Sequence, residues 1–265
     1  SGIFVQVLVF RFFMVIFVWF KIERLEQVDL HRWEKKKSNI ESLSNNIQRL
    51  RLNVTKDLNN GTEKDMVTAL VIAIMDKTAE RVGNNNSAEN GHYGITGLQK
   101  KHITVKGNSV FLKYVGKSGV EQEKNFTDER IASALKKVLQ NKGNDVFVTS
   151  EGFKISNDRV NRYLSRFNVT AKDIRGYSAN KWIIKSLEGK QSEGEEKDRK
   201  KIFNETLKKV SEKIGHGKAT LKKHYLIPEL ETNYIEKGKI INIADKGSYE
   251  RGGAIKIFNY EIGGL

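Results

Sequence analysis

The stretch HITVKGNSVFLKYVGKSGVEQEKNF, residues 102–126, decides the fold class. Its apolar and polar residues alternate in three short runs, separated by the turn sequences KGN at 106–108 and GKSG at 116–119. Alternation bounded by glycine turns predicts three strands, with Lys117 at the tip of a hairpin. No comparable run occurs elsewhere, so we expect an α+β fold that is mainly α-helical and has one small three-stranded antiparallel sheet.

On either side of this stretch, helix start signals precede apolar residues at helical spacing. Thr62 and Asp65 have the spacing of a capping box, which predicts an amphipathic helix over Met66–Lys77 that delivers Arg81 at its C-terminal end. An earlier helical stretch is predicted around Ile40–Leu52. Further helix caps are expected at Thr127, Ser156 and Thr170, the last of which places Arg175 a few residues inside its helix.

The C-terminal part of the chain alternates charged and apolar segments. Ser186–Lys200 is highly charged and contains two glycines, so we interpret it as a flexible connection. An apolar stripe from Phe203 to Ile214 then predicts a helix that ends at Gly215. A final short helix should carry Tyr225 and be stopped by Pro228, the only proline of the chain.

The charge balance indicates a polyanionic partner. The 265 residues include 47 Lys and Arg against 32 Asp and Glu, a formal net charge of +15. Neutralising phosphates supplies most of the sequence-independent affinity for nucleic acid. A membrane surface or an acidic protein would fit the charge equally well. Because the chain has no cysteine and its five histidines lack H-x-x-x-H spacing, we expect no disulfide and no metal site.

Residues 3–20, IFVQVLVFRFFMVIFVWF, are apolar except for Gln6 and Arg11. They barely reach the length of a membrane-spanning helix, and a central arginine costs roughly 2.5–3.5 kcal/mol on insertion scales. No basic region precedes them, so we expect neither a signal peptide nor secretion. Three interpretations stay open: a membrane anchor, which we do not favour, a packed strand or helix remnant, or an unnatural terminus.

Several basic residues and one tyrosine together suit phosphoryl transfer without a metal. Such chemistry needs positive charge around the non-bridging oxygens and a proton for the leaving oxygen. Arginine suits the first task, lysine the second, histidine can donate a hydrogen bond, and tyrosine is a possible nucleophile. Taken singly, each residue also fits an ordinary surface or packing role. The candidate catalytic residues are Arg81, Lys117, Arg175, His216 and Tyr225.

Their surroundings resemble those of type IB DNA topoisomerases, especially the compact viral and bacterial branch. The resemblance covers roughly residues 60–235 and rests on motifs in the family's order: RVGN at 81–84, YGIT at 93–96, GKSG at 116–119, KDIR at 172–175, and GH followed by HYLIP within 215–228. It implies the catalytic-domain fold that type IB topoisomerases share with tyrosine recombinases.

The resemblance also implies a mechanism. Tyr225 would attack the DNA backbone and stay attached to the 3′ phosphate, and Lys117 would protonate the departing 5′ oxygen. The remaining three, Arg81, Arg175 and His216, would stabilise the phosphorane. Swivelling of the nicked strand and religation would relax supercoiled DNA without ATP, nucleotide or metal. Phe111 stands where a phosphate-binding loop needs its first glycine, which agrees with the absence of a nucleotide.

Two features depart from the family pattern. Gly97 stands where many relatives have a second threonine, and residues 1–30 are too few and too apolar for the family's N-terminal clamp domain. A tyrosine recombinase is the alternative enzyme, although Lys172 occupies its usual histidine position and Arg175 and His216 lie unusually far apart, at 41 positions. The third hypothesis is a DNA-binding remnant without catalysis.

These inferences predict a domain organisation and partners. We expect an apolar N-terminal segment over 1–30, a catalytic domain over 31–235 and a C-terminal extension of unknown role over 236–265. The partner should be double-stranded DNA, bound by a monomer in the cytoplasm, the nucleus or a virion. Further DNA contacts are predicted at Tyr93, Lys100, Lys101 and Lys181.

Overall fold

The structure is a computed structural model that describes residues 49–83, 91–190 and 194–240. It also describes a few residues of the preceding segment, namely Gln27, His31, Glu34, Lys35, Ser38, Ser44 and Asn46. The chain divides into two units, 1–38 and 39–265, and the second unit contains both the fold and the candidate site. The predictions for residues 3–20 and for most of the C-terminal extension lie outside the described residues.

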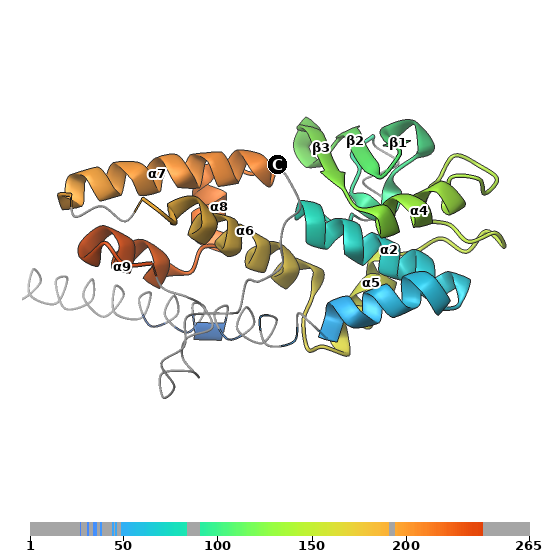
Figure 1. Ribbon diagram of the computed structural model, residues 1–265, viewed down its shortest axis with the longest axis horizontal. Coiled ribbons are helices and arrows are strands. Elements are labelled where there is room, and N and C mark those ends of the chain that lie inside the picture. The colour runs from blue at the N-terminus through green and yellow to red at the C-terminus, as the bar shows by residue number, and fades with distance from the viewer. Residues whose placement is uncertain are drawn as a thin grey trace, which may run out of the picture. The chain divides into compact units, whose positions relative to one another are not determined.

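The fold is mainly helical with one small sheet, as expected (Figure 1). Residues 49–60 are helical, which agrees with the end of the predicted stretch over Ile40–Leu52. None of the helices among the described residues is long and apolar enough to cross a membrane. The α-helices and strands are α2 (Glu63–Thr78), β1 (Ile103–Lys106), β2 (Ser109–Val115), β3 (Glu121–Thr127), α4 (Glu129–Val138), α5 (Asn157–Ser165), α6 (Ala171–Leu187), α7 (Glu196–Lys213), α8 (Lys218–His224) and α9 (Pro228–Lys237).

The three predicted strands form one antiparallel sheet in the order β1-β2-β3. Ile103 pairs with Leu112 across β1 and β2, and Tyr114 pairs with Gln122 across β2 and β3. Every second residue of β2 is buried, so one face of the sheet packs on the protein and the other faces solvent. The turn between β2 and β3 is a single turn of 3-10 helix, η3 (Lys117–Gly119), so Lys117 lies at the hairpin tip as predicted.

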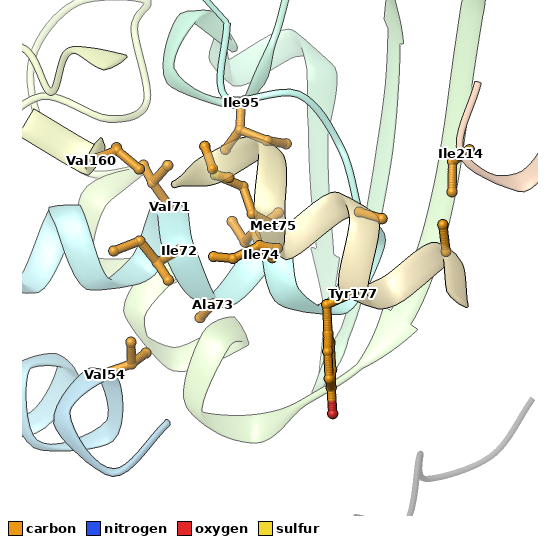
Figure 2. Packing of buried hydrophobic residues seen from close by; sticks show 14 of the residues in the cluster. Val54, Val71, Ile72, Ala73, Ile74, Met75, Ile95, Val160, Tyr177 and Ile214 are labelled. Carbon is orange, nitrogen blue, oxygen red and sulfur yellow. The ribbon is translucent and has the colours of Figure 1, made fainter. Parts of the chain in front are cut away.

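Helix α2 lies at the centre of the core. Every residue from Val67 to Met75 is buried, and the helix contacts α4, α5 and α6. Figure 2 shows α2 side chains from Val71 to Met75 among those of Val160, Ile95 and Tyr177. The prediction of an amphipathic helix was therefore wrong: neighbours cover α2 on all sides, and it has no solvent face in this stretch.

Three of the four predicted helix caps are confirmed. Thr62 Oγ1 accepts a hydrogen bond from the backbone N–H of Asp65 at 3.3 Å, and Thr170 forms the predicted capping box with Asp173. Ser156 likewise caps α5. The cap predicted at Thr127 was wrong, because β3 continues through that residue. Asp128 caps α4 instead, and its carboxylate accepts from two backbone N–H groups.

Two predictions for the C-terminal part were also wrong. The predicted flexible connection over Ser186–Lys200 is too long at both ends, since α6 runs to Leu187 and α7 begins at Glu196. Pro228 does not stop the helix that precedes Tyr225, because α8 already ends at His224. It is instead the first residue of α9, where a backbone N–H would have no partner within the helix. Helix α7 does end near Gly215, and Tyr225 is the C-cap residue of α8. Helices α2, α7 and α8 therefore each end within three residues of a predicted catalytic residue.

Candidate active site

The Arg175 guanidinium is the centre of the candidate site. Arg175 lies in the second turn of α6 and is 4% exposed. Its Nε donates to the carbonyl oxygen of Ala79 at 2.6 Å, and its Nη2 donates to that of Ile214 at 3.0 Å. The third nitrogen, Nη1, donates to the Tyr225 hydroxyl at 3.0 Å. Burial lowers the pKa of Arg175, but arginine keeps its charge in proteins, so a buried cation faces the phenol oxygen.

Tyr225 is held in place from two sides. Its ring lies 5.4 Å from the Arg175 guanidinium carbon and 5.3 Å from the centre of the His216 ring. On the backbone side, Asn180 Nδ2 donates to the carbonyl oxygen of Tyr225 at 2.7 Å, and Asn180 Oδ1 accepts from the N–H of Ile227 at 2.9 Å. Sequence reasoning missed Asn180. Its only signal was its place in the helix, five positions after Arg175.

Arg81 and His216 form the second pair of the site. Arg81 Nη2 lies 3.1 Å from Nδ1 and 3.2 Å from Nε2 of the histidine ring. Burial lowers the pKa of His216 to about 3, and the charges of Arg175 and Arg81 act in the same direction. The ring is therefore neutral at physiological pH. A neutral imidazole still has one N–H donor and one acceptor, so it can donate to an anion while it accepts from Arg81.

A crossing of two loops fixes the backbone beside Arg81. The N–H of Ile95 donates to the carbonyl oxygen of Arg81, and that of Thr96 donates to Val82, both at 2.9 Å. The backbones approach so closely that a Cβ added to Gly94 would lie 2.3 Å from the Cα of Gly83. Glycine is thus needed at the crossing, which explains the glycines of the RVGN and YGIT motifs in physical terms.

Lys117 projects from the hairpin turn toward the same site. The turn is closed by a hydrogen bond from the N–H of Gly116 to the carbonyl oxygen of Val120 at 2.7 Å. Lys117 is exposed, and its charge contributes to the lowered pKa of His216. An exposed ammonium near the buried Arg175 and the half-buried Arg81 is free to reach an incoming phosphate.

A cavity of about 280 Å³ joins these groups. His216 is not among its lining residues but contacts both Arg81 and Tyr225. An opening lined by cations and a phenol can hold a phosphate group, and positive charge around it would stabilise added negative charge during reaction. The lining comprises Arg81, Val82, Gly83, His92, Tyr93, Gly94, Lys117, Asn157, Ala171, Lys172, Arg175 and Tyr225.

The four predicted DNA contacts are dispersed. Tyr93 lines the cavity, and its ring lies 4.4 Å from that of His102. Lys100 Nζ donates to the carbonyl oxygen of Asn141, and Lys101 is exposed, but neither lines the cavity. Lys181 also lies outside it. Burial and the charge of Arg51 lower the pKa of Lys181.

Lys172 adds a further positive charge to the site. Lys172 was noted in the sequence only for its position before Arg175, yet it lines the cavity from the first turn of α6. Within the described ranges, no cluster of three or more histidine, aspartate or glutamate residues has the arrangement of a metal site. Among the residues that line the cavity, the positive charge is carried by Arg81, Lys117, Lys172 and Arg175.

The family model of the eukaryotic DNA topoisomerase I catalytic core matches residues 26–242. The DNA topoisomerase 1B of Acanthamoeba polyphaga mimivirus is 26% identical over 179 residues, which cover 62% of this chain and 53% of that protein. The DNA topoisomerase 1B of Vaccinia virus (strain Copenhagen) is 27% identical over 167 residues, which cover 59% of this chain and 48% of that protein. The chain thus spans about half the length of the curated relatives it matches.

Among solved structures, the XerH site-specific recombinase bound to difH substrate, in a pre-cleavage complex, has a TM-score of 0.43 and 16% identity, over 70% of this chain and 51% of that chain. A post-cleavage complex of XerH with palindromic difH has a TM-score of 0.45 and 17% identity, over 71% and 51%. The family model, in contrast, extends over more than half of the chain. On that ground, the protein belongs to the eukaryotic DNA topoisomerase I catalytic-core family.

Proposed function

We propose that this protein is a type IB DNA topoisomerase, which relaxes supercoiled double-stranded DNA through transient cleavage of one strand. The observation that carries the proposal is the 3.0 Å contact between Arg175 Nη1 and the Tyr225 hydroxyl, beside a cavity lined by Arg81 and Lys117. A phosphate in this cavity would have the phenol oxygen as attacking group and two guanidinium groups near its non-bridging oxygens. Neither a nucleotide nor a metal has a task in this scheme.

Each group has one role in the proposed reaction. The Tyr225 oxygen forms a bond to the phosphorus while its proton leaves to solvent, and the bond from phosphorus to the 5′ oxygen breaks. Lys117 gives its proton to that leaving oxygen. Arg81 and Arg175 neutralise the phosphorane, and the neutral His216 ring donates a hydrogen bond to it. Attack of the 5′ hydroxyl on the 3′ phosphotyrosyl bond reverses every step and releases the enzyme.

The charge of the protein also bears on its partner and its domain limits. The net charge of +15 and the cationic cavity support double-stranded DNA as the partner. We assign the catalytic part to residues 31–235 and keep Tyr93, Lys100, Lys101 and Lys181 as proposed DNA contacts. The protein would act as a monomer where DNA is present, in the cytoplasm, the nucleus or a virion.

Relaxation of supercoiled plasmid in EDTA without ATP is the direct test. Agarose gels should show relaxed topoisomers, because no step of the proposed reaction uses a metal or a nucleotide. Well-folded protein that leaves the plasmid supercoiled under these conditions would refute the proposal.

Tyr225→Phe tests the nucleophile. The variant should form no covalent adduct with end-labelled DNA on a denaturing gel but should still bind DNA in a gel shift, because it loses one hydroxyl and no charge. Tyr234→Phe is the matched control, since Tyr234 is also buried and its hydroxyl donates to the carbonyl oxygen of Lys190 at 2.7 Å, outside the cavity. An adduct formed by Tyr225→Phe would mean that another group attacks.

Lys117→Ala tests the general acid. A 5′-bridging sulfur leaves as a thiolate without a proton, so the variant should be slowed much less on that substrate than on ordinary DNA. General acids contribute about 10²–10⁴-fold, and a loss of this size is expected only with the oxygen leaving group. Equal slowing on both substrates would exclude Lys117 from this role.

A further inference from the structure

The inner face of the β2–β3 hairpin is polar next to the candidate site. On most of this sheet face the buried side chains are apolar, as at Val110 and Leu112. Near the turn, Tyr114 and its cross-strand partner Gln122 take their place, at 4% and 3% exposure, and Lys124 points the same way. Burying polar groups is unfavourable unless they have partners, so a polar patch here requires an explanation beyond packing.

Part of this patch binds the segment that carries Arg81. Glu80, which directly precedes Arg81, is 2% exposed. Its Oε2 accepts from the Tyr114 hydroxyl at 2.7 Å, and its Oε1 lies 3.1 Å from Lys124 Nζ. Burial and the charge of Glu80 raise the pKa of Tyr114, so its hydroxyl keeps its proton and remains a donor. Lys124 Nζ also donates to the carbonyl oxygen of Lys213, at the end of α7.

Gln122 lies between the two backbones that carry Lys117 and His216. A Cβ added to Gly116 would lie 3.0 Å from Gln122 Cγ, and one added to Gly215 would lie 2.5 Å from Gln122 Nε2. Those two glycines directly precede Lys117 and His216. The Gln122 amide therefore fills the space between the hairpin turn and the end of α7.

The Gln122 amide is not fully satisfied in this structure. Its Nε2 is buried and has no hydrogen-bond partner among the described residues. An unpaired buried donor is unfavourable, and most buried polar groups in proteins do have partners. An unpaired Gln122 amide between the backbones at Gly116 and Gly215 indicates that this side chain positions the two segments.

We propose that the polar inner face of the hairpin, formed by Tyr114, Gln122 and Lys124, positions Lys117 for proton transfer. Gln122 sets the distance between the hairpin turn at Gly116 and the backbone at Gly215, which precedes His216. Lys124 attaches β3 to Glu80 and to the end of α7. This inference rests on the proposed function. Gln122 is accordingly a positioning residue that acts through Lys117, while the contact of Arg175 with Tyr225 has its own supports at Ala79, Ile214 and Asn180.

Gln122→Met tests the inference, because methionine keeps the length of the side chain and removes both polar atoms. Single-turnover cleavage of ordinary DNA should slow by about tenfold or more, a part of the 10²–10⁴-fold that a positioned acid supplies. Cleavage of DNA with a 5′-bridging sulfur should stay within about twofold of wild type, since that leaving group needs no acid. Equal slowing on both substrates would overturn the inference.

Two further variants separate positioning from a general loss of structure. The double variant Lys117→Ala/Gln122→Met should cleave ordinary DNA no more slowly than Lys117→Ala alone, because Gln122 acts only through Lys117. Additive losses would overturn the inference. Lys113→Met, on the exposed face of the same hairpin, should cleave both substrates at the wild-type rate.

Lys124→Met should give the same selective loss as Gln122→Met, and Lys124→Arg should restore cleavage of ordinary DNA if it restores the ion pair with Glu80. Urea denaturation identifies the conditions in which each variant is folded, and rates are compared there. A Lys124→Met variant that is folded and cleaves ordinary DNA at the wild-type rate would exclude Lys124. If wild-type protein forms no covalent adduct with either substrate, the proposed function itself fails, and this role fails with it.

Discussion

Replacement of Asn180 by alanine should weaken both the fold and the cleavage step. Asn180 is fully buried in α6 and makes three hydrogen bonds with its side chain. Nδ2 donates to the carbonyl oxygens of Gly176 and Tyr225, each at 2.7 Å, and Oδ1 accepts from the N–H of Ile227 at 2.9 Å. The side chain thus attaches the segment around Tyr225 to the helix that carries Arg175.

The size of the effect follows from the groups that lose their partners. Alanine would leave the Tyr225 carbonyl oxygen and the Ile227 N–H buried without these bonds, at a cost of about 1–3 kcal/mol each. We therefore expect the free energy of unfolding to fall by roughly 2–6 kcal/mol. For a protein of this size, that corresponds to a decrease in Tm of roughly 4–24 °C.

Urea denaturation and single-turnover cleavage test the two halves of this prediction. Cleavage should slow because Tyr225 loses its backbone support, while DNA binding should change little because no charge is removed. Asn53→Ala is the matched control: Asn53 Nδ2 donates only to the Arg49 carbonyl oxygen, at 2.9 Å on an exposed helix surface. The reasoning is refuted if Asn180→Ala is no less stable than Asn53→Ala, or if folded Asn180→Ala cleaves at the wild-type rate.

The remaining predictions concern the loop crossing, the histidine and salt. Gly94→Ala should destabilise the protein strongly in a thermal melt, because its Cβ would lie 2.3 Å from a backbone atom of Gly83, whereas Gly217→Ala meets nothing within 4 Å and should be nearly neutral; similar melting of the two variants would contradict this. Burial, with the charges of Arg175 and Arg81, lowers the pKa of His216 from 6.5 to about 3, so its contribution to stability is complete above about pH 6.5 and is lost as the pH falls toward 3. Urea denaturation at about pH 4–7 should therefore show a shallower pH dependence for His216→Gln than for wild type, and parallel curves would disprove the assignment. DNA binding should weaken steeply with salt in a titration, and a flat profile would argue against phosphate contacts.

Patterns within short stretches of sequence correctly predicted the elements that depend on interactions between neighbouring residues. The sheet and the hairpin turn with Lys117 were correct because alternation and glycine turns act over a few residues. The cap at Thr127 was one residue early, since Thr127 and Asp128 are both good caps and only the extent of β3 decides between them. Pro228 was misread for a similar reason, because proline both ends helices and begins them.

Other errors came from interactions that no local pattern contains. The surface covering α2 is supplied by α4, α5 and α6, so the spacing of its apolar residues could not reveal burial on all sides. The charge of Ser186–Lys200 is compatible with a solvated helix as well as with a flexible connection. Asn180 acts on Tyr225 from 45 positions away, and Gln122 meets Gly215 only through the fold.

The five candidate catalytic residues came from motif order, and the structure brings their side chains to one place. Lys100, Lys101 and Lys181 were chosen because they flank motifs, but position along the chain does not determine the direction of a side chain. Tyr93 lines the cavity because the loop crossing fixes its neighbour Gly94.

The triple attachment of Arg175 makes the reactive state conditional on complete assembly. Its guanidinium donates to Ala79 at the end of α2, to Ile214 at the end of α7 and to the Tyr225 hydroxyl. All three segments must therefore be folded before Tyr225 has its cationic neighbour. A partly unfolded or newly synthesised chain would lack this arrangement. If the protein cleaves DNA as proposed, it would gain that activity only after these segments have assembled around the Arg175 side chain.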